Sequence, residues 1–135
     1  MIVYDDALLD RARSRSRAVI GTPTVVGHAS NPLCGDDIEV SARVVDGVIL
    51  AASYRSHACA LTSASASLLA DLVPGRPIAS ARGMGDALAA ALADRARAMP
   101  AGFEDLAVAQ LLPSRRRCAL LPWEALGTAL DTAQA

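Results

Sequence analysis

The sequence predicts an α+β fold, in which helices cover a small antiparallel sheet of about three strands. Residues 38–44 alternate apolar and polar side chains, as a half-buried strand does, and residues 48–54 also have strand character. Between them stands Asp46-Gly47, a dipeptide that strongly favours a two-residue hairpin turn. After Cys59 the apolar residues change to helical spacing, which indicates that the second half of the chain is mostly helical.

The segment before the hairpin contributes two shorter elements. Residues 5–19 combine paired leucines with alternating arginines, which predicts a helix with a basic, solvated side. A Gly-Thr-Pro sequence ends that helix, and residues 24–26 then predict a short edge strand. Asn31-Pro32 marks a turn between this strand and the hairpin.

Proline and glycine divide the second half into helical segments. The predicted helices are one that begins near residue 60 and ends before Pro74-Gly75, one over residues 84–99 that Pro100 closes, a shorter one over residues 103–112, and one carrying Trp123, Leu126 and Leu130. Alanine is abundant in these segments, so the helices are expected to pack closely.

The composition excludes several classes of protein. With 135 residues, 53% of them hydrophobic, the chain can fold around one core, and we expect a single domain over residues 1–135. All 13 basic residues are arginines and the net charge is −1, which argues against a nucleic-acid partner. No apolar run approaches the roughly 18 residues that cross a bilayer, and the acidic N-terminus lacks a signal-peptide core. We therefore expect a cytoplasmic protein with no membrane partner.

Three cysteines carry the chemistry of interest. Cys34 and Cys59 are 25 residues apart, Cys59 and Cys118 are 59 apart, and none belongs to a C-x-x-C pair. In a reducing compartment they are not expected to form structural disulfides. Their spacing alone leaves two alternatives, which are inert buried thiols and a shared site of reactive thiols or metal ligands.

The local sequence around each cysteine favours the shared site. Cys34 lies in a turn two residues before Asp36, and Cys59 precedes a predicted helix, whose N-terminus stabilises a thiolate. Cys118 follows residues 115–117, three arginines that are expected to lower its pKa. Three thiolates and the carboxylate of Asp36 match tetrahedral zinc, or an iron–sulfur cluster with one oxygen ligand.

Three segments carry a family resemblance. Residues 31–36 resemble the N-P-x-C-G-D signature of the NifU N-terminal, IscU and SufU scaffold family, and residues 59–67 resemble its second-cysteine segment. Residues 117–126 resemble its third-cysteine segment, with a Trp-x-Ala-Leu ending typical of the SufU branch. Arg117 stands where IscU proteins have histidine, and Ala58 replaces the usual glycine before the second cysteine. The resemblance covers roughly residues 20–130.

The resemblance implies a SufE/NifU-like fold and one site made by Cys34, Asp36, Cys59 and Cys118. That site would hold Zn²⁺, iron or a [2Fe–2S] cluster, and Cys34 would accept persulfide sulfur from a cysteine desulfurase. The implied protein is an iron–sulfur cluster assembly scaffold or sulfur acceptor, serving apo-protein cluster acceptors, rather than an enzyme with its own turnover. An alternative is a zinc-dependent sulfurtransferase partner of the desulfurase that builds no cluster. A third is a zinc-stabilised interaction module with inert cysteines.

Other residues near these segments have open roles. His57, two residues before Cys59, is either a partly exposed loop residue or a group that approaches the metal. His28 is expected to be structural or solvated, and Trp123 to pack beneath the Cys118 segment.

Overall fold

The computed structural model describes residues 4–13 and 23–133. Its elements are, in order, α1 (Asp6–Arg13), β1 (Val25–Asn31), β2 (Asp36–Val45), β3 (Val48–His57), α2 (Ala60–Leu72), α3 (Ile78–Ala93), the 3₁₀ segments η1 (Glu104–Leu111) and η2 (Pro113–Arg115), and α4 (Arg116–Ala133). The three strands form one antiparallel sheet in the order β1-β2-β3. The predicted α+β class, a three-stranded antiparallel sheet with packed helices, is confirmed.

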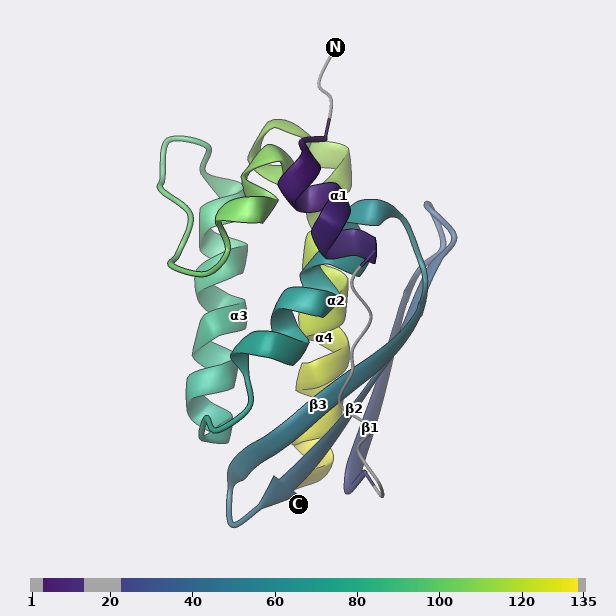
Figure 1. Cartoon of the computed structure of the whole chain (residues 1–135), viewed down its shortest axis with the longest axis vertical. Coiled ribbons are helices and arrows are strands. Elements are labelled where there is room, and N and C mark those ends of the chain that lie inside the picture. The colour runs from purple at the N-terminus through teal and green to yellow at the C-terminus, as the bar shows by residue number, and fades with distance from the viewer. Residues whose placement is uncertain (1–3, 14–22, 134–135) are drawn as a thin grey trace.

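The helices lie on one face of the sheet (Figure 1). Helix α4 crosses β1 and β2, α2 packs against α4 and β3, and α3 packs on α4. Leucine, isoleucine and alanine fill most of the buried core between these layers. No helix within residues 4–13 and 23–133 is long and apolar enough to cross a membrane.

The hairpin of β2 and β3 forms where the alternating pattern predicts it. Ile38, Val40 and Ala42 point into the core, at most 1% exposed, as one face of a period-two strand should. Asp46 and Gly47 have φ angles of 52° and 75°, which is the left-handed pair that a type I′ turn requires. The turn residues and the strand pattern therefore specify the same register.

Strand β1 is longer than the predicted strand over residues 24–26. It pairs with β2 from Val25, opposite Ala42, to Asn31, opposite Asp36. Gly27 and its small or polar neighbours have weak strand propensity, so this extension has no local signal. Helix α4 packs on this part of β1, and a Cβ on Gly27 would lie 2.0 Å from the carbonyl oxygen of Ala125, so this close packing requires glycine.

The second long helix was predicted over residues 84–99, and both of its ends are corrected. Helix α3 begins at Ile78, directly after Pro77, and stops at Ala93. The buried side chain of Gln110 explains the early end, since its Nε2 donates to the carbonyl oxygens of Ala91 (2.9 Å) and Arg97 (2.8 Å). These bonds satisfy carbonyls that a continuing helix would otherwise use.

The remaining helices differ from expectation in type or extent. Helix α2 ends as predicted before Pro74-Gly75, but the short helix predicted over residues 103–112 is the 3₁₀ segment η1. Helix α4 starts earlier than Trp123 and continues through Pro122. The helix predicted over residues 5–19 is present as α1, and residues 14–22 lie outside the described part of the chain.

Candidate metal centre

The four predicted ligands lie on segments that meet at one end of the sheet. Cys34 is in the turn between β1 and β2, and Asp36 is the first residue of β2. Cys59 is the N-cap residue of α2, two residues after the end of β3, and Cys118 lies in the first turn of α4. Antiparallel pairing brings the end of β1, the start of β2 and the end of β3 together.

Three of the four form a group that can hold an ion. One ligand atom each from Cys34, Asp36 and Cys118 lies within 4.8 Å of the others, among residues 4–13 and 23–133. The two sulfur atoms are 3.7 Å apart. A tetrahedral metal with bonds to sulfur of about 2.3 Å places two sulfur ligands about 3.8 Å apart. The thiol pair therefore has the spacing of two ligands on one tetrahedral ion.

Cys59 lies next to this group and outside it. Its Sγ contacts Oγ1 of Thr62 at 3.5 Å, and its backbone N–H donates to Oδ1 of Asp36 at 2.9 Å. The structure thus brings three predicted ligands together and connects the fourth through its backbone.

The carboxylate of Asp36 is almost completely buried, with 3% of the residue exposed. A buried carboxylate requires hydrogen-bond donors to offset its lost hydration. The backbone N–H of Cys59 donates a hydrogen bond to Oδ1, and the hydroxyl of Thr62 donates one to Oδ2 at 3.0 Å. Both oxygens are therefore held, and each keeps lone-pair capacity for a metal.

Asn31 organises the turn that carries Cys34. Its Oδ1 accepts the N–H of Leu33 (3.3 Å), and its carbonyl oxygen accepts the N–H of Cys34 (3.1 Å). Its Nδ2 points at the sulfurs of Cys34 (3.6 Å) and Cys118 (4.0 Å). Residue 31 belongs to the quoted sequence signature, but sequence reasoning gave its side chain no contact with the thiols.

The three arginines before Cys118 do not lower its pKa as expected. Burial of the thiol raises the pKa of Cys118, and the hydrogen bond to Asp36 and the nearby Cys59 raise it further. Arg117 points away, to the carbonyl oxygen of Ser30 at 3.3 Å and to Glu124 at 3.6 Å. Desolvation of the thiol therefore outweighs charges that are adjacent only in sequence.

Arg115 is the arginine that faces the site. Its pKa is raised by the neighbouring Tyr4 and Cys59, the latter also through a hydrogen bond. Tyr4, half-buried just before α1, has its own pKa raised by burial, with Cys59 and Cys118 adding to the effect. The guanidinium thus supplies positive charge chiefly beside Cys59, with a smaller interaction with Cys118.

Comparison with known proteins identifies the family of the chain. Residues 4–132 match the family described as the NifU-like N terminal domain. The chain belongs to this family. The predicted membership in the NifU, IscU and SufU scaffold family is confirmed.

Curated relatives and a solved structure extend the match over nearly the whole chain. The chain is 28% identical to the iron–sulfur cluster assembly scaffold protein IscU of Thermotoga maritima, over 96% of this chain and 93% of that protein. It is 23% identical to the zinc-dependent sulfurtransferase SufU of Bacillus subtilis, over 92% of this chain and 86% of that one. A NifU-like N-terminal protein from Brucella abortus has the same fold, with a TM-score of 0.85 at 24% identity, covering 96% and 92% of the two chains.

Neither histidine of this NifU-like domain belongs to the group of ligand atoms found among the described residues. His57 is exposed at the end of β3, and its Cα pairs with that of Asp37. His28 is exposed on β1, and its Nε2 lies 2.5 Å from a carboxylate oxygen of Asp37. The expectation that His28 is structural or solvated is confirmed.

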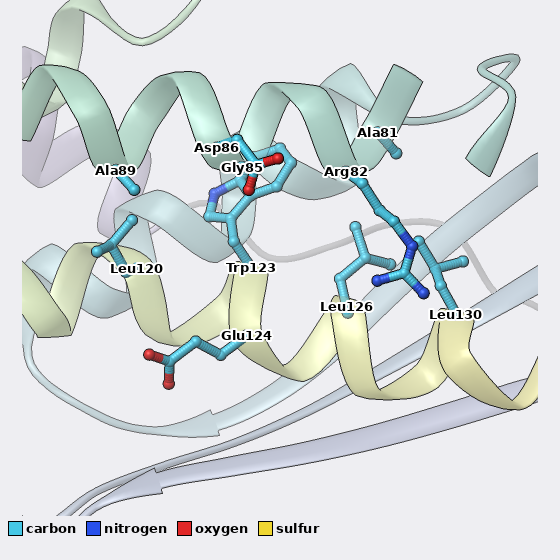
Figure 2. Close-up of a pocket in the computed structure, with 11 residues that line it drawn as sticks. Ala81, Arg82, Gly85, Asp86, Ala89, Leu120, Trp123, Glu124, Leu126 and Leu130 are labelled. Carbon is cyan, nitrogen blue, oxygen red and sulfur yellow. The ribbon is translucent and has the colours of Figure 1, made fainter. Parts of the chain in front are cut away.

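A separate cavity of about 430 Å³ lies between α3 and α4 of the NifU-like domain. Figure 2 shows the indole of Trp123 directed toward Gly85 and Asp86 on α3. The indole N–H donates to Oγ of Ser65 at 3.2 Å, and the ring meets Phe103 edge to face. None of the cysteines lines this cavity, so it is distinct from the candidate metal centre.

Proposed function

We propose that this protein is an iron–sulfur cluster assembly scaffold that binds Zn²⁺ or assembles a [2Fe–2S] cluster at Cys34, Asp36, Cys59 and Cys118. The observation that supports this most directly is the 3.7 Å separation of the sulfurs of Cys34 and Cys118, with a carboxylate oxygen beside them. Thiolates and a carboxylate are donors that suit zinc and iron. Bound metal would neutralise the thiolates, and the assembled cluster would be cargo for apo-protein acceptors.

Cys34 is the proposed sulfur acceptor, receiving persulfide sulfur from a cysteine desulfurase. It is the exposed member of the three cysteines, whereas Cys118 is buried and Cys59 is half-buried. Its thiolate would attack the outer sulfur of the desulfurase persulfide and form a new S–S bond. The desulfurase cysteine leaves as a thiolate, so the sulfur is transferred without an external oxidant.

The alternative function is a zinc-dependent sulfurtransferase partner of the desulfurase that builds no cluster. The relative named as a zinc-dependent sulfurtransferase favours it, since that match spans 92% of this chain. Both functions need reduced thiols, which suits a cytoplasmic setting. They differ in whether iron and sulfide accumulate together on the protein.

Elemental analysis of the purified protein tests both functions. The experiment measures zinc, iron and acid-labile sulfide in the wild type and in Cys34→Ala, with Ser53→Ala, a half-buried residue of β3, as the matched control. About one zinc per chain that Cys34→Ala loses supports the sulfur-acceptor function, whereas iron with equal sulfide supports the scaffold. Incubation with a cysteine desulfurase and cysteine should place a persulfide on Cys34, detected by mass spectrometry. Wild-type protein that takes up neither metal nor persulfide would overturn the proposal.

A further inference from the structure

The hydroxyl of Thr62 occupies an unusual position beside the candidate metal centre. Thr62 is completely buried in the first turn of α2. Its Oγ1 lies 3.0 Å from Oδ2 of Asp36, 2.9 Å from the carbonyl oxygen of Cys118 and 3.5 Å from Sγ of Cys59. One hydroxyl thus contacts three of the four proposed ligand residues.

This arrangement differs from that of other threonines in helices of the protein. A helical threonine commonly donates to the carbonyl four residues earlier in its own helix. Thr128 and Thr132 of α4 do so, at 3.2 and 3.4 Å. Thr62 lies in the first turn of α2, where the residue four positions earlier, Ala58, is outside the helix, and its hydroxyl instead contacts Asp36 of β2 and Cys118 of α4.

We propose that Thr62 is a positioning residue of the metal centre, which orients the carboxylate of Asp36 and holds the thiol of Cys59 beside the site. This inference rests on the proposed function, because it assigns a role toward the same ligands. Oδ1 of Asp36 is held by the backbone N–H of Cys59, so Thr62 supplies the second bond, at Oδ2, that fixes the rotation of the carboxylate. Such outer partners of metal ligands orient the ligands and strengthen metal binding.

The same hydroxyl also connects the elements that carry the ligands. A hydroxyl has one hydrogen, so Thr62 donates to Asp36 or to the carbonyl of Cys118 at any moment, while its lone pairs can accept the S–H of Cys59. Asp36 begins β2 and Cys118 lies in α4. Loss of the hydroxyl is therefore expected to loosen the ligand geometry while the apolar packing of α2 stays in place.

Ser65 provides a matched control one turn further along α2. It is also completely buried, and its hydroxyl also donates across to α4, at the carbonyl oxygen of Ala119. Among the described residues its hydroxyl bonds to Ala119 and to the indole N–H of Trp123, and to none of Cys34, Asp36, Cys59 and Cys118. Ser65→Ala thus removes an α2–α4 hydrogen bond of the same kind without touching a proposed ligand.

The test compares Thr62→Val, Thr62→Ser and Ser65→Ala with the wild type. Zinc affinity is measured by competition with a chromophoric chelator, and the stability of the metal-free proteins by urea unfolding. Thr62→Val should weaken zinc binding about 10- to 100-fold, and Thr62→Ser should restore it because it keeps the hydroxyl. Ser65→Ala should lower stability and leave the zinc Kd unchanged. Unchanged affinity in Thr62→Val, or an equal loss in Ser65→Ala, would overturn the positioning role.

A second readout does not depend on metal. Hydrogen exchange of the backbone amide of Cys59 reports its bond to Asp36 in the metal-free protein. Thr62→Val should speed this exchange because the carboxylate is free to turn, and Ser65→Ala should not. Wild-type protein that takes up neither metal nor persulfide would remove the proposed function, and the exchange rate would then decide the role of Thr62. Equal exchange in Thr62→Val and wild type would overturn it.

Discussion

Replacing Gly27 by alanine tests how closely α4 packs on the sheet. A Cβ at this position of β1 would lie 2.0 Å from the carbonyl oxygen of Ala125 and 2.6 Å from the backbone nitrogen of Ala129. Both are backbone atoms of α4, so no side-chain rotation relieves the overlap. The strand and the helix must separate instead.

The cost of this separation can be estimated. Relief of the overlap requires a shift on the order of 1 Å, and overpacking of a tight core costs about 1–3 kcal/mol, occasionally more. Because the whole of α4 must move against β1, we expect a loss of about 3 kcal/mol. In a protein of 135 residues, an unfolding entropy of about 2.1 cal/mol/K per residue converts each kcal/mol into about 3–4 °C of Tm. Gly27→Ala should therefore lower Tm by about 10 °C.

Thermal unfolding of the metal-free protein, followed by circular dichroism, measures this effect. Gly83→Ala is the control, because Gly83 is exposed in the interior of α3 and a Cβ there meets nothing within 4 Å. That variant should gain about 0.5–1 kcal/mol from helix propensity. Since α4 also carries Cys118, Gly27→Ala should weaken zinc binding as well. A Gly27→Ala protein with the same Tm as the wild type would refute the close packing of α4 against Gly27 of β1.

Three further substitutions test the site and the fold. Asp36→Ala should lengthen the lifetime of a bound cluster, followed by its visible absorbance, because the labile oxygen ligand is gone; a shorter lifetime would contradict this role. Gln110→Leu should cost about 1–3 kcal/mol in urea unfolding, because buried carbonyls at the end of α3 lose their donor, and zinc content should not change. Gly47→Val should cost at least about 1–2 kcal/mol, because φ at this turn position is 75°; equal urea midpoints would argue against the type I′ turn.

The parts of the fold that were predictable are those with local causes. The hairpin follows from strand alternation and from Asp46-Gly47, whose conformational preference needs no distant contact. The extension of β1 was missed because it depends on Gly27 meeting α4, about 100 residues later in the chain. The end of α3 was missed because Gln110, outside that helix, donates a hydrogen bond to the carbonyl oxygen of Ala91 in its last turn.

The sequence by itself determined the family of the chain and predicted which residues carry the chemistry, because the signature around Cys34 and Asp36 is local. Only the tertiary structure decided how these groups are arranged. Burial reverses the pKa shift expected for Cys118, and the carboxylate of Asp36 is held by Thr62, whose role no sequence pattern indicated. Desolvation and hydrogen bonding act between segments that packing brings together, so neither can be read from neighbours along the chain.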